Sequence, residues 1–139
     1  MNIYMERNKF FIIDDDPFNN KICTMIIKSV YTESEVISFT EPENGLAYIK
    51  EKYTNSTIDF TTIIFLDINM PTMTGWEFLE EYEKLDDEIK DRIVIFILSS
   101  SVDENDIIKT KEFRCLDFIS KPLSAAALQN ALSLISPGI

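Results

Sequence analysis

The residues with the clearest chemical potential are three aspartates and one lysine, each just after a short apolar run: Asp14, Asp15, Asp67 and Lys121. Carboxylates that lie together repel one another, which raises their pKa values unless a cation is bound between them. Oxygen ligands with a lysine nearby suit Mg²⁺, which takes a few carboxylates and keeps several waters. A carboxylate beside Mg²⁺ and a lysine can act as a nucleophile towards a phosphoryl group. This chemistry requires that the fold bring the four side chains together.

Asp67 follows the apolar run Ile63-Ile64-Phe65-Leu66, and Pro71 comes shortly after it. Four apolar residues in a row, two of them β-branched, predict a strand that is covered on both faces. The run is too short for a typical helix, and the proline ends the pattern. In parallel α/β sheets, ligand and catalytic groups gather at the carboxyl ends of the strands, so Asp67 stands at a favourable position.

The same patterns predict the remaining elements. Four further strands are predicted at Lys9–Ile13, Glu35–Phe39, residues 92–98 and Asp117–Ser120. Helical spacing predicts helices at Pro17–Val30, residues 41–53, 76–85 and 103–113, and after Ser124. Asp16 is the predicted N-cap of the first helix, because Pro17 suits a first turn. Ser124 is the predicted cap of the last helix.

Each helix has a face that we expect to be buried. These faces are Ile22, Met25, Ile26 and Val30 in the first helix, Leu46, Ile49 and Tyr53 in the second, Phe78 or Leu79 with Tyr82 and Leu85 in the third, and Leu128, Ala131, Leu132 and Ile135 in the last. The fourth helix has only Ile107, Ile108 and Phe113 to bury. We therefore expect it to be the most mobile helix.

Strand and helix alternate five times along the chain, which predicts an α/β fold with a parallel sheet and helices on both faces. Five strands suit the doubly wound, flavodoxin-like strand order 2-1-3-4-5, with its switch point between the first and third strands. Asp14, Asp15 and Asp67 should then face each other across that crevice. Ser99 and Lys121 fall at the same edge of the sheet. Any one strand-end polar residue is usually only solvated, so the prediction depends on all of them meeting at one edge.

Composition indicates one ordinary globular domain, with 139 residues, 45% hydrophobic and 27% charged. The formal net charge of −11 repels phosphates, so we expect no direct binding of nucleic acid. No apolar run is long enough to span a membrane, and the start of the chain lacks the apolar segment of a signal peptide. A cytoplasmic location is expected.

Cysteine and histidine usage narrows the chemistry further. Cys23 and Cys115 have no metal-ligand spacing, so we expect small buried thiols in a reducing compartment. Histidine is absent. This excludes Ser-His and Cys-His mechanisms and any His-ligated metal. The chain also cannot supply its own phosphohistidine.

Four segments, taken together and in order, resemble the receiver domain of two-component response regulators of the single-domain type. They are Ile12-Ile13-Asp14-Asp15-Asp16-Pro17, Leu66-Asp67-Ile68-Asn69-Met70-Pro71 with Gly75, Leu98-Ser99-Ser100-Ser101 with Asp106, and Phe118-Ile119-Ser120-Lys121-Pro122. The resemblance covers residues 9–135. It implies an N-terminal extension at residues 1–8, a receiver domain at residues 9–136 and no output domain.

The resemblance assigns roles at the site. Asp67 would be the phosphoacceptor, forming an aspartyl phosphate. Asp15 would bind Mg²⁺ directly, Asp14 would bind it mainly through water, and the backbone carbonyl of Asn69 would be a further ligand. Lys121 would pair with a phosphoryl oxygen and stabilise developing charge.

Other implied roles concern signalling. Ser99 would hold the phosphoryl group and, with Phe118, form the switch pair. A cis peptide bond is implied between Lys121 and Pro122. The implied signalling surface is the fourth helix, fifth strand and fifth helix, at residues 103–135. Arg114 departs from the glycine common in the family, which could mark a partner surface specific to this chain.

The implied function is that of a phosphoprotein in a two-component system or phosphorelay. The phosphoryl donor would be a histidine kinase or histidine phosphotransfer protein, and the output would pass to another protein. Acceptance and hydrolysis would be self-catalysed, so no enzyme activity on other substrates is expected. Neither nucleic acid nor membrane would be a direct partner.

Three alternatives fit the residues less well. A phosphatase of the haloacid dehalogenase type needs an acid two residues after its nucleophile, where this chain has Asn69, and an amide cannot exchange a proton at neutral pH. A flavin-binding flavodoxin would place its phosphate where Asp14, Asp15 and Asp16 would repel it. An adaptor receiver that works without phosphorylation would not need the whole set of acids, serine and lysine.

Overall fold

The computed structural model describes residues 9–54, 61–101 and 103–135. In this part of the chain, five parallel strands form one sheet in the order β2-β1-β3-β4-β5. The strands are β1 (Lys9–Ile13), β2 (Glu35–Phe39), β3 (Thr62–Leu66), β4 (Ile93–Ser99) and β5 (Asp117–Ser120). The predicted doubly wound fold is confirmed, with strand ends that differ from the prediction by at most one residue.

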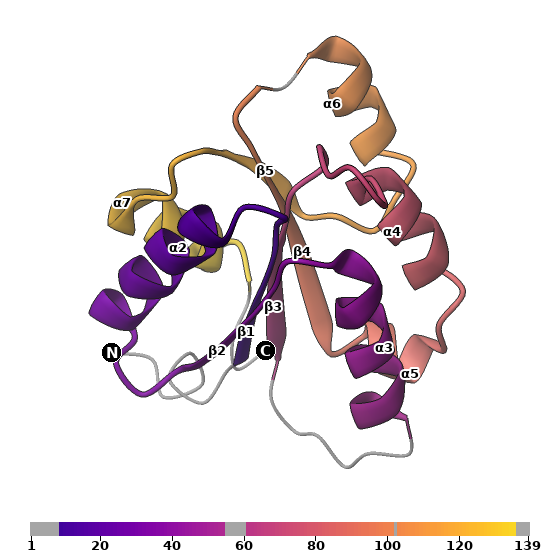
Figure 1. The fold of residues 1–139 in the computed structure, drawn as a ribbon, viewed down its shortest axis with the longest axis horizontal. Helices are drawn as coiled ribbons and strands as arrows, with labels where there is room; N and C mark the ends of the chain where they lie inside the picture. The colour runs from indigo at the N-terminus through magenta and orange to yellow at the C-terminus, as the bar shows by residue number, and fades with distance from the viewer. Residues whose placement is uncertain (1–8, 55–60, 102, 136–139) are drawn as a thin grey trace.

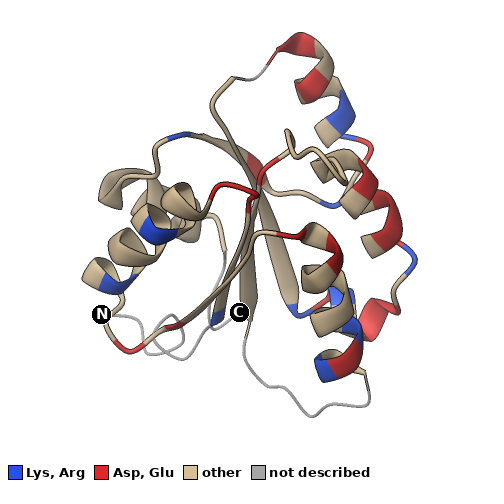
Figure 2. Cartoon of the chain, in the orientation of Figure 1, with Lys and Arg blue, Asp and Glu red and all other residues tan. Residues whose placement is uncertain are grey.

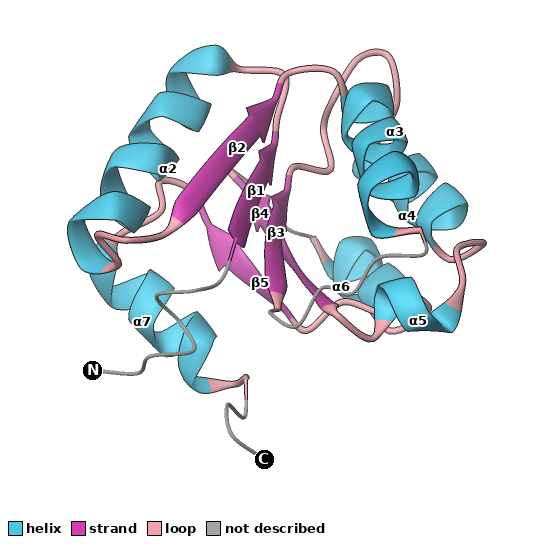
Figure 3. Cartoon of the chain, turned by 90° about the horizontal axis from the view of Figure 1, so that it is seen from below, coloured by secondary structure: helices cyan, strands magenta, loops and turns pink. Residues whose placement is uncertain are grey.

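Helices cover both faces of the sheet (Figure 1). The helices are α2 (Pro17–Val30), α3 (Pro42–Tyr53), α4 (Gly75–Tyr82), α5 (Asp87–Lys90), α6 (Glu104–Thr110) and α7 (Ala125–Ser133). Figure 3 shows α2 and α7 on one side of the sheet and the other helices on the opposite side. The predicted caps are confirmed, since the Asp16 and Ser124 side chains accept backbone N–H bonds from the first turns of α2 and α7. Within the described residues, no helix has the length and apolar character to span a membrane.

Alternate residues of each strand point to opposite faces and build two apolar layers. Phe10 and Ile12 belong to the layer that contains Leu128 of α7. Phe11 belongs to the opposite layer with Phe78 of α4. Strand β3 lies in the middle of the sheet and is buried along its whole length. The centre of the sheet is therefore a rigid support for whatever follows β1 and β3.

The predicted apolar face of α2 is only partly right, since Ile26 and Val30 pack, partly buried, against the layer that contains Phe10. Met25 is 63% exposed, and Ile22 is only half-buried. The buried residues of α2 are instead Asn19, Asn20, Cys23 and Ile27. The helix is turned so that two amides, rather than two more apolar side chains, face the sheet. The predicted burial of Cys23 is confirmed, whereas Cys115 is only partly buried.

Two other helices differ from prediction. The third predicted helix ends at Tyr82, and the short helix α5 that follows was not predicted. Helix α6 ends before Phe113, and its apolar side chains Ile107 and Ile108 are 47% and 58% exposed, so their predicted burial is wrong. The predicted burial of α3 and α7 is confirmed, with Ile135 only partly buried. The predicted N-terminal extension and residue 136 lie outside the described residues.

Candidate functional site

The first and third strands bring two acids together at the carboxyl edge of the sheet. Ile13 at the end of β1 is paired with Leu66 at the end of β3. The Asp67 backbone N–H donates to the Ile13 carbonyl at 2.9 Å, and the Asp14 N–H donates to the Phe39 carbonyl at 3.1 Å. These bonds continue the sheet pattern by one residue, so both acids are fixed relative to the strands.

Asp15 joins them, and one carboxylate oxygen from each of Asp14, Asp15 and Asp67 lies within 4.8 Å of the other two. Figure 2 shows the acidic segment after β1 at the edge of the sheet. Asp14 and Asp67 are buried, whereas Asp15 is exposed. Three carboxylates this close repel one another, and hard divalent cations favour such oxygen ligands. The donor set therefore fits a metal ion of the Mg²⁺ type.

Asp14 is the most fully bonded of the three acids and is 1% exposed. Its Oδ1 accepts the backbone N–H of Asp16 at 2.9 Å. Its Oδ2 accepts from Asn19 Nδ2 at 2.7 Å and from Lys121 Nζ at 2.7 Å. Its main-chain carbonyl accepts from Asn20 Nδ2 at 2.9 Å. Both carboxylate oxygens of Asp14 already accept hydrogen bonds. Asp14 is therefore better suited to fix the positions of the groups around it than to act as a metal ligand by itself.

The two amides were missed by the sequence analysis. The available signal was their spacing, since Asn19 and Asn20 follow the strand-end acid within the first turn of a helix that starts at Pro17. An amide there can fold back onto the loop that carries the acid. The predicted face of this helix was drawn from its apolar residues alone and did not include them.

Asp67 is 4% exposed, and its carboxylate is less completely bonded. Its Oδ1 accepts the Asn69 backbone N–H at 3.2 Å, and its Oδ2 lies 3.6 Å from Lys121 Nζ. Burial raises the pKa of Asp67 above its ordinary value of 3.8, and the charges of Asp14 and Asp15 raise it further. The hydrogen bond from Asn69 and the charge of Lys121 oppose this rise in part. Asp67 is thus a desolvated carboxylate that gains from a bound cation.

Lys121 reaches the acids from the loop after β5. Its backbone N–H donates to the Ser99 carbonyl at 2.9 Å, which ties the ends of β4 and β5 together. The peptide bond between Lys121 and Pro122 is cis. Burial lowers the pKa of Lys121, but its bond to Asp14 and the charges of Asp14 and Asp67 outweigh burial and raise that pKa overall. Lys121 therefore stays a cation between two acids.

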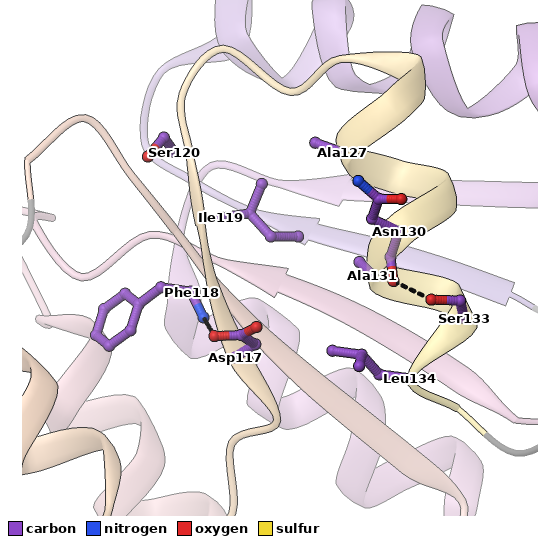
Figure 4. Close-up of a pocket in the computed structure, with 9 residues that line it drawn as sticks. All are labelled: Asp117, Phe118, Ile119, Ser120, Ala127, Asn130, Ala131, Ser133 and Leu134. Atoms are coloured by element: carbon purple, nitrogen blue, oxygen red, sulfur yellow. Dashed lines mark hydrogen bonds between the residues drawn. The ribbon is translucent and has the colours of Figure 1, made fainter.

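The two predicted switch residues are not part of the acid cluster. Ser99 is buried at the end of β4, and its hydroxyl donates to the Ser101 carbonyl at 2.9 Å. Phe118 on β5 is half-buried against the apolar layer that contains Phe78. In Figure 4 the Phe118 ring points away from α7, while Ile119 points towards that helix. The structure thus brings the acids and lysine together and leaves Ser99 bonded to its own loop.

Gly75 brings helix α4 against the site. Its N–H donates to the Ile68 carbonyl at 3.1 Å. A Cβ atom at this position would lie 2.6 Å from the Asp67 carbonyl oxygen and 2.7 Å from Ile68 Cα, distances that backbone atoms do not tolerate. Glycine is therefore required for α4 to begin directly beside Asp67.

This fold and site define a flavodoxin-like protein with a cluster of three acids and a lysine at its switch point. Residues 10–133 match the response regulator receiver domain family, and the chain belongs to that family. Phosphorylation-dependent signalling in two-component systems is general to it.

The relatives include proteins of similar length. The chain is 29% identical to the chemotaxis protein CheY of Bacillus subtilis, over 91% of this chain and 95% of that protein. It is 31% identical to CheY of Listeria monocytogenes, over 89% and 94%. The crystal structure of a two-component response regulator from Cytophaga hutchinsonii has a TM-score of 0.80 and 30% identity, over 91% of this chain and 95% of that one.

Much longer proteins also match. Hybrid signal transduction histidine kinases C and L of Dictyostelium discoideum are 29% and 28% identical, over 87% and 89% of this chain. The chain spans only 10% and 7% of their lengths.

Proposed function

We propose that this chain accepts a phosphoryl group on Asp67 from a phosphohistidine donor, a histidine kinase or a histidine phosphotransfer protein. The observation that carries the proposal is the position of Lys121, whose Nζ lies 3.6 Å from Asp67 Oδ2 while it is held by Asp14 at 2.7 Å. A buried carboxylate with a cation beside it and a second acid behind that cation suits phosphoryl acceptance.

In the proposed transfer, an oxygen of the ionised Asp67 attacks phosphorus. The new O–P bond forms as the N–P bond to the donor imidazole breaks, and the released nitrogen keeps the electron pair and binds a proton. Hydrolysis later returns the Asp67 carboxylate and inorganic phosphate, and the chain turns over no other substrate. Lys121 stabilises the charge that develops on the phosphoryl oxygens.

Mg²⁺ is the proposed cofactor. Asp15, Asp67 and the carbonyl of Asn69 would hold it directly, and Asp14 would act mainly through water. When bound, the ion neutralises charge on the phosphoryl oxygens. The convergence of three carboxylates within 4.8 Å supports this assignment.

The proposed output is a shift in the surface formed by α6, β5 and α7, which a partner protein would read. The added phosphoryl charge would draw the Ser99 hydroxyl from Ser101 towards Asp67, and Phe118 would move inward as it does so. The exposure of Ile107 and Ile108 on α6 supports an apolar surface that a partner protein could bind. A cytoplasmic location stays a prediction.

The experiment is incubation of the purified chain with acetyl phosphate and Mg²⁺, followed by intact mass measurement. The wild type should gain one phosphoryl group, and Asp67→Asn should gain none. EDTA should abolish the gain. Equal labelling of both proteins would overturn the proposal, and sustained turnover of a phosphate monoester would favour the phosphatase alternative.

A further inference from the structure

One oxygen of Asp14 has two donors at the same distance. Lys121 Nζ and Asn19 Nδ2 both lie 2.7 Å from Asp14 Oδ2. The Asp14 and Asn19 residues are 1% and 8% exposed, so water has little access to this contact. An ionised carboxylate is an acceptor only, and a buried oxygen that loses its donors is costly. The two donors therefore offset the cost of burying the Asp14 carboxylate.

Asn19 is held in place independently of the lysine. It lies in the first turn of α2, which begins at Pro17 and is capped by the Asp16 side chain. The Asp16 N–H in turn donates to Asp14 Oδ1 at 2.9 Å. Cap, amide and acid thus form one unit where β1 leads into α2, whereas Lys121 belongs to a different connection, after β5.

Phosphorylation makes competing demands on Lys121. Its Nζ lies 2.7 Å from Asp14 but 3.6 Å from Asp67. To pair with a phosphoryl oxygen on Asp67, the ammonium group must turn towards that residue and weaken its contact with Asp14. Asp14 Oδ2 then depends on the one donor that does not move, the amide of Asn19.

We propose that Asn19 is a positioning residue, which keeps Asp14 hydrogen-bonded while Lys121 turns to the phosphoryl group. This inference rests on the proposed function. The Asn19 amide allows the Lys121 ammonium group to turn away from Asp14, because Asp14 Oδ2 then still accepts one hydrogen bond.

The test uses beryllofluoride with Mg²⁺ as a phosphoryl mimic, with binding measured by calorimetry. Asn19→Ala should weaken beryllofluoride binding roughly 10- to 100-fold, the range expected when a buried charged oxygen loses its donor. In the Lys121→Ala background the same substitution should change the affinity no more than about twofold, because Asp14 then depends on Asn19 equally in the free and bound states.

Asn20→Ala is the matched control. Asn20 is also a buried amide, on the next residue, but it donates to the main-chain carbonyl of Asp14. Its removal should lower thermal stability without changing the coupling to Lys121. If Asn19→Ala does not fold, Asn19→Leu fills the same space without a donor.

The possible results distinguish a failure of the inference about Asn19 from a failure of the proposed function. An equal loss of affinity from the Asn19 substitution in both backgrounds would show a merely structural role and overturn the inference. Wild-type binding that Asn19→Ala leaves unchanged would also overturn the inference but leave the proposed function standing. A wild type that binds no beryllofluoride, like Asp67→Asn, would overturn both.

Discussion

The indole of Trp76 in α4 stacks on the ring of Phe113 after α6, with centroids 5.9 Å apart and ring planes 22° from parallel. Lys109 Nζ of α6 lies 5.7 Å from the centroid of the same indole. No residue of α6, which lies wholly within the described part of the chain, is buried. Trp76 therefore attaches α6 to a helix that begins at Gly75, directly beside Asp67.

Trp76→Leu should loosen α6 selectively. Loss of the stacking and cation contacts, together worth on the order of 1 kcal/mol, should speed amide exchange in α6 about fivefold. Labelling of Asp67 by acetyl phosphate should continue. Hydrogen exchange with mass spectrometry measures the first effect.

Tyr48→Leu controls for general destabilisation, since Tyr48 is a half-buried aromatic on α3 whose ring lies 5.5 Å from that of Phe11. It should affect α3 and the sheet, but not α6 in particular. If both variants accelerated exchange equally over the whole chain, Trp76 would have no special role in attaching α6.

Gly75→Ala should destabilise the protein by about 2 kcal/mol or more, because the new methyl group would meet the backbone beside Asp67. Urea unfolding measures the loss. Gly45→Ala is the matched control, because its Cβ would meet the flexible end of the Ile13 side chain at 3.1 Å. A loss at Gly45 as large as that at Gly75 would contradict the close approach of α4 to the site.

The raised pKa of Asp67 predicts a pH dependence of stability. Because its folded-state pKa lies above 3.8, chiefly through burial, the folded chain binds the proton more tightly than the unfolded chain. Stability should therefore fall as the pH rises from 3.8 through the raised value, and the penalty should be complete above it.

Asp67→Asn removes this penalty. In EDTA near neutral pH, it should raise the midpoint of thermal unfolding. The gain should shrink as the pH falls towards the ordinary pKa of an aspartate. If Asp67→Asn were less stable than the wild type throughout this pH range, the buried charge of Asp67 would not destabilise the folded chain, and the prediction would be wrong.

Lys121→Ala should separate phosphoryl acceptance from signalling. The variant should still be labelled at Asp67, roughly 10-fold more slowly or worse, because one charge-stabilising donor is gone. Acetyl phosphate should change amide exchange in α6 of the wild type but not of this variant. Lys84→Ala, an exposed lysine on the loop after α4, is the control. A normal α6 response in Lys121→Ala would contradict the switch scheme.

The sequence predicted the sheet because its strands are compact apolar runs, and all of them except β2 end in or directly before acids, serine or lysine. It predicted the site because parallel strands place such ends at one edge. The face of α2 was only partly predicted because that helix carries apolar residues on nearly every side, from Phe18 to Val30. Its rotation is set by tertiary bonds from Asn19 and Asn20 to Asp14, which no periodicity contains.

The region from α4 to α6 was predicted less well for a different reason. Helix α5 has only four residues, too few to show a helical period. On α6, Ile107 and Ile108 look like a core face but remain exposed, because the aromatic contact between Trp76 and Phe113 attaches this region instead. Long-range side-chain pairs of this kind cannot be found from local patterns.

The most direct test of the account is to locate the phosphoryl group chemically. After labelling with acetyl phosphate and Mg²⁺, borohydride reduction converts an acyl phosphate to an alcohol, so a phosphorylated aspartate becomes homoserine. Peptide sequencing by mass spectrometry should find homoserine at position 67 and unmodified aspartate at positions 14 and 15. Homoserine at another aspartate, with Asp67 unchanged, would contradict the central claim.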